Sequence, residues 1–380
     1  MDFDLSNEQS MIRDMVREFA TAEIEPLAQE VDRTGRFPIE TFRKMGKLGL
    51  LGLPIDEAYG GAGADTVSYA LAVEEIGRAC GSTGLSYAAH VSLGCGPLQA
   101  FGTVEQKETY LVPLARGEAL GSFGLTEPSA GSDAGGTQTR AKRVDDAYLI
   151  TGSKCYITNA SYAKCVIVTA VTGEDSRGKK QIGAFIVPTD SDGFAILRTY
   201  EKMGLRGSDT TELAFDEVRI PLGNRLGSET EGFKQFLKTL DGGRISIGAL
   251  SVGIARAAYE AALRYAKERV QFGHSLSKMQ AIQFKLADMA MHLELARTAV
   301  LRAAWLKDQG RSFSKEAAMA KLFASEMCVR TCDQAVQIHG GAGYVSDFPV
   351  ERYFRDAKLM EIGEGTSEIQ RLVIARQIGC

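Results

Sequence analysis

A stretch of about 100 residues in the middle of the chain has the pattern of β-strands, and helical patterns lie on both sides of it. Short runs of β-branched and aromatic residues, at 148–151, 166–171 and 184–187, are separated by turn residues such as Asp145 and Asp146. No helical pattern falls between these runs, so crossover helices are not expected. The stretch therefore predicts a small β-barrel or sandwich set between two helical regions.

The flanking regions show helical periodicity. Before the β stretch, Ser6 and Gln9 have the spacing of a capping box, and apolar residues follow at helical intervals. After it, residues 244–269 are apolar on nearly every side, and apolar residues recur at intervals of four and three from 282 to 300, as in a helix bundle. A chain of 380 residues is also too long for one ordinary core. We therefore expect a mainly α, α+β fold with three domains: an N-terminal helical domain (1–118), a middle β domain (119–229) and a C-terminal four-helix bundle (230–380).

Charge and hydropathy argue against several classes of protein. The formal net charge is −4 and no dense run of Lys and Arg occurs, which argues against a nucleic-acid partner. No run reaches the ~18 apolar residues of a membrane span, and the acidic residues 1–5 lead into a helix rather than a signal peptide. The seven cysteines are scattered, as expected of reduced thiols, and Cys328 and Cys332 are expected to be helix-core residues rather than metal ligands. These features predict a soluble protein, cytosolic or organellar, without a metal site.

A glutamate between two glycines is the main candidate for chemistry. Gly363 and Gly365 allow the backbone to turn sharply around Glu364 and another molecule to approach it closely. Ser367 and Gln370 have the spacing of a capping box, so a helix is expected to begin there. A carboxylate held there in apolar surroundings would have a raised pKa and could act as a general base near neutral pH. The local sequence also fits a surface turn with a solvated acid, and by itself it does not decide between the two.

Five short segments, taken together, point to a family. They are residues 123–133 (FGLTEPSAGSD), 154–159 (KCYITN), 269–273 (RVQFG), 337–344 (QIHGGAGY) and 363–366 (GEGT). In this order they resemble the acyl-CoA dehydrogenase flavoproteins, and the likeness covers essentially the whole chain. Within that family the chain looks most like the short-chain (butyryl-CoA) branch of Bacillus-like bacteria. The resemblance implies a bacterial, cytoplasmic enzyme with this family's fold.

The resemblance further implies that the chain binds FAD and a coenzyme A thioester. By matching position, the residues that would line the flavin or lie beside its ring are Phe123, Leu125, Thr126, Ser132, Tyr156, Ile157 and Thr158, and Thr366 and Glu368 would also touch the cofactor. Those that would contact the FAD of a neighbouring subunit are Arg269, Gln271, Phe272, Gln280, Gln337, Gly340 and Gly341. Those that would contact the substrate are Ser132, Asp241, Arg244, Gly363 and Gly365. Sharing of FAD between subunits implies a homotetramer built as a dimer of dimers. Taken alone, Arg269 and Gln280 also fit ordinary helix-surface residues, and Arg244 also fits an ion pair with Asp241.

The implied reaction is the oxidation of a short-chain acyl-CoA to a trans-2-enoyl-CoA. Glu364 would remove the α-proton while a hydride passes from the β-carbon to N5 of the flavin, and electron transfer flavoprotein would accept the electrons. The α-carbon is a far weaker acid than a carboxylic acid, so the developing enolate needs hydrogen-bond donors at the thioester oxygen. In the family these donors are the backbone N–H of the catalytic glutamate and a ribityl hydroxyl of FAD. Some relatives carry the base at the position of Gly243, which cannot serve, so Glu364 is the only candidate.

Two positions depart from the family pattern. Many relatives have Trp where this chain has Tyr156, which keeps an aromatic ring beside the flavin, and short- and medium-chain relatives commonly have Tyr where it has Gly363. The missing ring leaves extra room, so branched short chains (isovaleryl, 2-methylbutyryl) and medium chains stay open beside butyryl. An acyl-CoA oxidase also stays open, although oxidases are usually much longer. So does a catalytically silent CoA-binding flavoprotein, against which the intact Glu364 argues.

Overall fold

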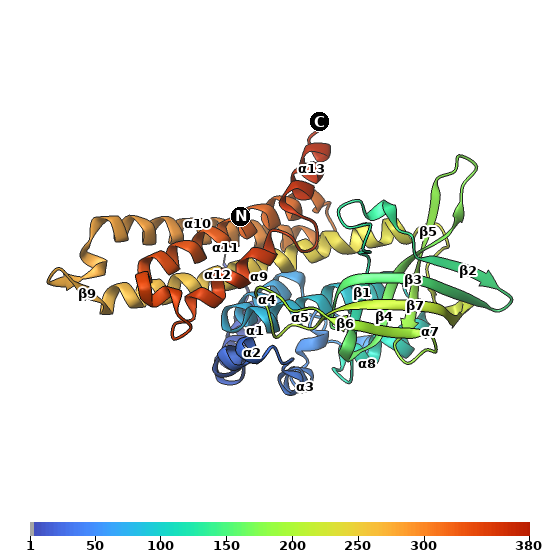
Figure 1. Ribbon diagram of the computed structural model, residues 1–380, viewed down its shortest axis with the longest axis horizontal. Helices are drawn as coiled ribbons and strands as arrows, with labels where there is room; N and C mark the ends of the chain where they lie inside the picture. The colour runs from blue at the N-terminus through green and yellow to red at the C-terminus, as the bar shows by residue number, and fades with distance from the viewer. Residues whose placement is uncertain (1–3) are drawn as a thin grey trace.

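The computed structural model describes residues 4–380, so residues 1–3 of the expected N-terminal domain lie outside the described part. Figure 1 shows an elongated molecule with a sheet at one end, a small hairpin at the other and long helices between them. Along the chain, helices come first, then strands, then helices again, which is the order predicted from the sequence.

The first helical region consists of short helices joined by tight helical turns. The predicted capping box at Ser6 is confirmed, because its side chain accepts from the Gln9 amide while the Gln9 side chain accepts from the Ser6 amide. The α-helices are α1 (Asn7–Phe19), α2 (Ala28–Thr34), α3 (Ile39–Lys47), α4 (Thr66–Ala79), α5 (Gly81–Ala88), α6 (Gly96–Phe101), α7 (Val104–Gln106) and α8 (Val112–Ala115). Three π-helical turns continue them, η1 (Ala20–Ile24), η5 (Ala89–Cys95) and η6 (Lys107–Leu111).

The middle region forms one mixed eight-stranded sheet, in the order β6-β7-β3-β2-β4-β5-β8 with β1 paired to β4. The three runs predicted as strands lie inside β3, β4 and β5, and no α-helix separates them. Pairs β1–β4 and β2–β4 are parallel and the other pairs are antiparallel. The strands are β1 (Leu120–Gly124), β2 (Arg140–Val144), β3 (Ala147–Thr158), β4 (Ala163–Glu174), β5 (Lys180–Pro188), β6 (Phe194–Thr199), β7 (Thr210–Pro221) and β8 (Arg225–Leu226).

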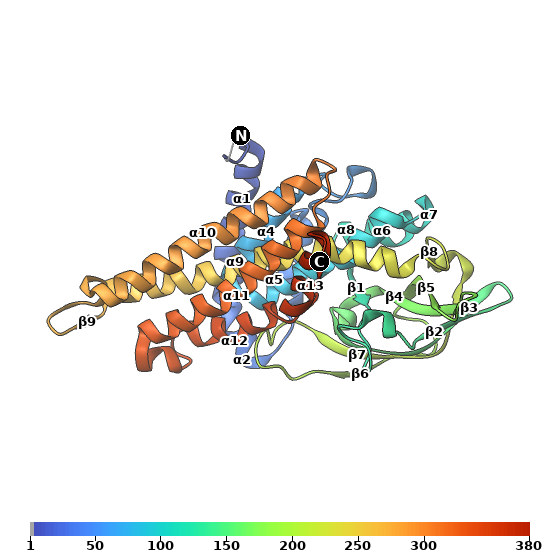
Figure 2. The same cartoon turned by 90° about the horizontal axis from the view of Figure 1, so that it is seen from above.

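The last region is a bundle built around α9 (Gly232–Glu268), which in both views runs from the hairpin to the sheet (Figures 1 and 2). Its other helices are α10 (Gln280–Asp308), α11 (Ser314–His339), α12 (Val350–Met360) and α13 (Ser367–Gln377), and its hairpin pairs β9 (Val270–Gln271) with β10 (His274–Ser275). The capping box predicted at Ser367 and Gln370 is wrong. Thr366 is the N-cap of α13, and the Gln370 side chain donates instead to the Gly365 carbonyl, because that carbonyl lies within its reach at 2.9 Å.

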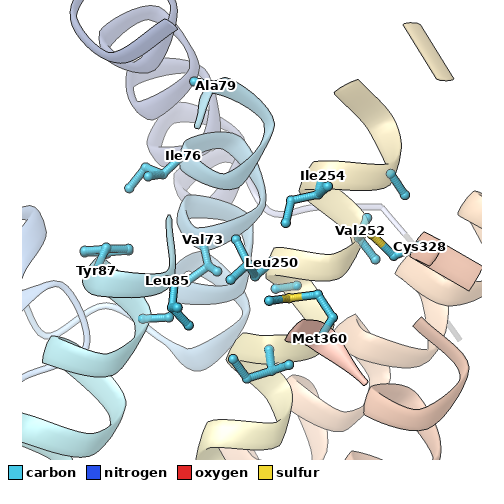
Figure 3. Close-up of a cluster of buried hydrophobic side chains, with 14 of the residues drawn as sticks. Val73, Ile76, Ala79, Leu85, Tyr87, Leu250, Val252, Ile254, Cys328 and Met360 are labelled. Carbon is cyan, nitrogen blue, oxygen red and sulfur yellow. The ribbon is translucent and has the colours of Figure 1, made fainter. Parts of the chain in front are cut away.

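The two helical regions share one hydrophobic core although about 100 residues of sheet separate them along the chain. Figure 3 shows Val73 of α4 beside Leu250 of α9, with Met360 of α12 close to them. Core packing of this extent on both sides of α9 holds that helix rigidly in place. The sheet has its own core, formed by residues such as Tyr148, Phe185 and Phe215.

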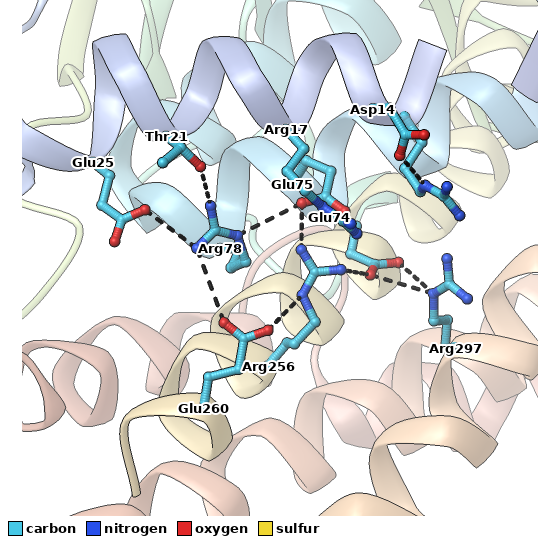
Figure 4. A network of polar contacts seen from close by, with 11 residues as sticks. Asp14, Arg17, Thr21, Glu25, Glu74, Glu75, Arg78, Arg256, Glu260 and Arg297 are labelled. Carbon is cyan, nitrogen blue, oxygen red and sulfur yellow. Dashed lines mark hydrogen bonds and ion pairs between the residues drawn. The ribbon is translucent and has the colours of Figure 1, made fainter. Parts of the chain in front are cut away.

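Two buried carboxylates join α4 to the helices around it (Figure 4). Glu74 pairs with Arg256 and with Arg297, the latter at 2.9 Å, and Glu75 pairs with Arg256 and with Arg17, the latter at 2.8 Å. A buried carboxylate needs such compensation, since an unpaired charge in the interior costs several kcal/mol. The network therefore fixes α1, α9 and α10 against α4.

Within residues 4–380 no helix has the length and apolar character that crossing a membrane requires.

Candidate active site

A cavity of about 680 Å³ lies where the sheet meets the bundle. It is bounded by the end of β1, the end of β3, the loop between β6 and β7, the N-terminal part of α9 and the loop between α12 and α13. Its volume is in the range of sites for small molecules and cofactors. The predicted residues on its wall are Phe123, Leu125, Thr126, Ser132, Tyr156, Ile157, Thr158, Arg244, Gly363, Glu364, Gly365 and Thr366.

Glu364 is held in this wall by a strained turn. Its φ is +53° and that of Gly365 is +97°, both in the left-handed region that most side chains avoid. The turn is fixed from both ends, because the Gly363 amide donates to the Leu359 carbonyl at 2.8 Å and the Ser367 amide donates to the Glu361 carbonyl at 2.9 Å. Strain of this kind is typical of functional sites, where surrounding contacts enforce it.

The Glu364 carboxyl is enclosed although the residue as a whole is only half-buried. Its Oε2 has less than 1 Å² exposed and no hydrogen-bond partner within residues 4–380. Burial raises the pKa of Glu364 to about 7, and the positive charges of Lys321 and Arg244 keep the pKa from rising further. The solvated-turn alternative is therefore not what the structure shows. The carboxyl has the environment of a general base that works near neutral pH.

Gly243 on α9 leaves the space that this carboxyl fills. A Cβ atom added at Gly243 would lie 1.8 Å from Glu364 Oε2 and 3.4 Å from Leu93 Cδ2 on η5. No side chain fits there without displacing the carboxylate. The next residue, Arg244, is buried and pairs with Asp241, whose Oδ1 also accepts from the Ser314 hydroxyl at 3.0 Å. The pairing considered from the sequence thus exists, while the Arg244 side chain also reaches the cavity wall.

On the sheet side of the cavity, Tyr156 presents its ring to the open space. The ring is 65% exposed, its backbone φ is +60°, and its centroid lies 4.9 Å from that of Tyr200. The hydroxyls of Thr126, Ser132 and Thr158 lie on residues of the same wall. An exposed aromatic ring beside several hydroxyl groups suits a flat, polar-edged ligand such as a flavin ring.

A buried ion pair that we did not predict from the sequence supports this wall. Lys154 on β3 donates to Glu127 at 2.8 Å and to the Leu125 carbonyl at 3.1 Å. The Glu127 carboxylate in turn accepts from the amides of Gln138 and Thr139. These contacts fix both ends of the loop that carries Thr126 and Ser132. The available signal was a single lysine inside a strand, which alone does not identify its partner.

The remaining predicted residues do not line the cavity. Those implied to reach a neighbouring subunit lie at the opposite end of the bundle, at the β9–β10 hairpin, the start of α10 and the end of α11 (Figure 1). The ring of Phe272 there is 90% exposed, and the ring of His339 stacks on Tyr265 at 4.2 Å. Glu368 is exposed on α13. Asp241 does not line the cavity, but it pairs with Arg244, which does. The residues away from the cavity are Asp241, Arg269, Gln271, Phe272, Gln280, Gln337, Gly340, Gly341 and Glu368.

The sequence matches three domain profiles of one family along almost its whole length. The acyl-CoA dehydrogenase N-terminal domain matches residues 6–118, the middle domain 122–218 and the C-terminal domain 230–379. The chain is 67% identical over 378 residues to "Probable acyl-CoA dehydrogenase YngJ" of Bacillus subtilis (strain 168), with 100% of both chains covered. The chain belongs to the acyl-CoA dehydrogenase family. The family and fold class predicted from the sequence are thereby confirmed, as is an oxidoreductase acting on a CH–CH group.

Other relatives in the family are described by their substrate or cofactor. "Acyl-CoA dehydrogenase, short-chain specific" of Clostridium acetobutylicum is 48% identical, with 100% of both chains covered. Butyryl-CoA dehydrogenase from Megasphaera elsdenii has a solved structure with a TM-score of 0.97 at 44% identity, both chains covered fully. A chain in the structure of the electron transferring flavoprotein of Acidaminococcus fermentans has a TM-score of 0.97 at 46% identity, again with both chains covered fully. An acyl-CoA dehydrogenase complexed with FAD from Bacillus anthracis has a TM-score of 0.94 at 34% identity, with 99% of this chain and 67% of that chain covered.

Proposed function

We propose that this acyl-CoA dehydrogenase oxidises short-chain acyl-CoA thioesters to trans-2-enoyl-CoA, with Glu364 as the base that removes the α-proton. The observation that carries the proposal is the enclosed carboxyl of Glu364 on the cavity wall, which has a pKa of about 7 and one oxygen without a hydrogen-bond partner in the described part of the chain. The short-chain Clostridium enzyme and the Megasphaera butyryl-CoA dehydrogenase support the substrate class. Electron transfer flavoprotein is the proposed acceptor, and the Acidaminococcus structure supports it.

FAD, the cofactor of this family, is proposed to bind with its ring system in the cavity beside Tyr156. Bound there, it supplies the acceptor for the hydride lost from the substrate's β-carbon. The chain's own residues position the reactants. Arg244 and Gly365 are proposed to contact the thioester's CoA side, and the Glu364 amide is proposed to donate to the thioester oxygen. Glu364 then has one task, to take the α-proton, and Gly243 leaves room for its carboxylate to do so.

The acyl group is proposed to enter the apolar part of the cavity. Leu85 and Ala89 come from the α5–η5 segment, Leu93 from η5, and Leu240 and Ile247 from α9. No charged group lies among these five, so an unbranched or branched hydrocarbon fits and a carboxylated chain does not. Gly363 adds space at the same wall, since a Cβ built there would meet nothing closer than the Leu359 carbonyl at 3.5 Å.

A panel of acyl-CoA thioesters tests the substrate class. The panel contains C4 to C16 straight chains, isovaleryl-CoA and 2-methylbutyryl-CoA. We expect the highest kcat/KM with a four- to six-carbon acyl group and a fall of at least about tenfold at C16, because even one methylene that does not fit is worth about 1–3 kcal/mol of discrimination. Bleaching of the flavin absorbance measures each reaction. The Gly363→Tyr variant is the matched comparison, because its ring removes space; it should lose branched substrates more than butyryl-CoA. A preference for C16 would contradict the short-chain proposal.

The pKa of Glu364 predicts the pH dependence of the reaction. A carboxylate base acts only when ionised, and the pKa of Glu364 in the folded protein is raised to about 7. We therefore expect kcat/KM to reach its full value above pH 7 and to fall about tenfold per pH unit below it. Initial rates with butyryl-CoA between pH 4 and 9 measure this. An acid limb near pH 4.5, the ordinary range of a glutamate, would show that the base is solvated or is another group.

The residues at the far end of the bundle are proposed to contact FAD bound to a neighbouring subunit in a homotetramer. The exposed ring of Phe272 supports a partner at this place, since large exposed apolar side chains commonly mark interfaces. We also propose that the enzyme works in the bacterial cytoplasm. Its seven cysteines are all unpaired and six of them are buried, which suits a reducing compartment.

A further inference from the structure

Lys321 is a buried lysine that the reaction described above does not use. It lies on α11 with 0% of its surface exposed, among the buried small residues Ala317, Ala320 and Ala324. α11 packs closely against α9 here, since a Cβ atom added at Gly248 on α9 would lie 3.8 Å from the Lys321 backbone. A lysine is rarely buried to this extent without a partner, because its ammonium loses its hydration.

The ammonium of Lys321 points at the loop of Glu364. Its Nζ donates to the Gly365 carbonyl at 2.8 Å, and within residues 4–380 no salt bridge joins it to a carboxylate. The Gly365 carbonyl also accepts from Gln370 Nε2 at 2.9 Å, and the Glu364 carbonyl lies 3.3 Å from the same nitrogen. The strained turn at Glu364 and Gly365 is thus held by side chains from α11 and α13.

The positive charge of Lys321 also acts on the Glu364 carboxyl and lowers its pKa. The charged groups that also act on Lys321 are Arg244 on α9, Glu361 after α12 and Glu368 on α13. The negative charge of Glu364 also contributes to the raised pKa of the Tyr69 phenol on α4. Arg244 is already paired with Asp241, whereas Lys321 forms no ion pair with a carboxylate among residues 4–380. Burial lowers the pKa of Lys321 to about 8 and the negative charge of Glu364 opposes that shift, so the ammonium is charged at neutral pH.

We propose that Lys321 is a positioning residue of the dehydrogenase: it fixes the Glu364–Gly365 backbone through the Gly365 carbonyl and supplies the uncompensated positive charge that keeps the Glu364 carboxylate ionised. The inference rests on the proposed role of Glu364 as base. It assigns to Lys321 no contact with substrate or cofactor. Its consequence is that the protonation state of the base, in the loop between α12 and α13, depends on a residue 43 positions earlier in the chain, on α11.

The test compares the pH dependence of kcat/KM for butyryl-CoA among flavin-loaded variants. Lys321→Gln and Lys321→Met remove the charge, and Lys321→Arg keeps it. Because a nearby positive charge favours the carboxylate, its loss raises the pKa of Glu364 and moves the acid limb to higher pH, by about one unit or more. We therefore expect kcat/KM at pH 6 to fall about tenfold in the two neutral variants, with a smaller loss above pH 8. In Lys321→Arg the acid limb should stay where it is in the parent enzyme.

The matched control is Ser325→Ala, one turn further along the buried face of α11. Among the residues that the structure describes, its hydroxyl donates only to the Leu322 carbonyl, at 3.1 Å. This variant should leave the acid limb unmoved. Melting temperature and flavin absorbance show for every variant whether the protein is folded and loaded. If neither neutral variant folds, Lys321→Arg decides, because a shifted limb in that variant overturns the proposal. An unmoved limb in folded Lys321→Gln and Lys321→Met also overturns it, while active Glu364→Gln enzyme would instead overturn the proposed base.

Discussion

Glu364→Gln enzyme should bind FAD and butyryl-CoA and yet turn over at least about 10³-fold more slowly than the parent, because general-base catalysis commonly contributes 10²–10⁴-fold. Gln has nearly the shape of Glu, so the strained turn and the packing against Gly243 are kept. What the variant lacks is a group that accepts the α-proton. No neighbour can replace it, since Gly243 has no side chain and Lys321 and Arg244 are cations.

Rapid mixing with butyryl-CoA and flavin absorbance separate binding from chemistry in this variant. Binding perturbs the spectrum at once, whereas proton and hydride removal bleach it. Glu201→Gln is the matched control, because Glu201 is the other carboxylate on the described cavity wall but lies on an exposed loop. We expect less than about a threefold change in that control. Near-normal bleaching by Glu364→Gln would mean that another group takes the proton.

The sequence predicted the parts of this molecule that depend on local pattern. Runs of β-branched and aromatic residues between turn residues marked β3, β4 and β5. A long apolar stretch marked α9, and apolar residues at intervals of four and three marked α10, because this spacing follows from helix geometry. Glycines on both sides of Glu364 indicated a tight turn, and the observed φ of +53° at Glu364 agrees with it. The residues that line the cavity were reached through the resemblance to the family, not through spacing.

Contacts between distant parts of the chain were not predictable in this way. Lys154 on β3 is 27 residues from Glu127, which lies in the loop after β1, and Lys321 is 44 residues from the carbonyl to which it donates. Nothing local distinguishes such a lysine from a solvated one. The N-cap of α13 was also misplaced by one residue, because Thr366 and Ser367 are both good caps and only the tertiary position of Gln370 decides between them. The common core of α4 and α9 is a third such case, since it joins regions on both sides of the sheet.

Gly243→Ala should lower kcat for butyryl-CoA by about 100-fold without unfolding the protein, because an error of about 1 Å in the position of a reacting group costs that much. The added Cβ would lie 1.8 Å from Glu364 Oε2, far inside contact distance, so the carboxylate must leave its present position. In a helix interior the same change favours folding by about 0.5–1 kcal/mol, which opposes the cost of the local clash. The melting temperature should therefore change by only a few degrees while activity is mostly lost.

Gly242→Ala supplies the control for this prediction from the adjacent position in the same helix. A Cβ there would meet only Lys307 Nζ, at 3.7 Å, so the helix gains the same propensity without touching Glu364. Its kcat should stay within about twofold of the parent enzyme. Steady-state rates and thermal melts are measured for both variants. Both substitutions raise helix propensity, but only the one at Gly243 brings a side chain against the Glu364 carboxylate, so a difference in activity is due to that contact. Equal activities in the two variants would show that the carboxylate does not need the space beside Gly243, and the position assigned to the base would then be wrong.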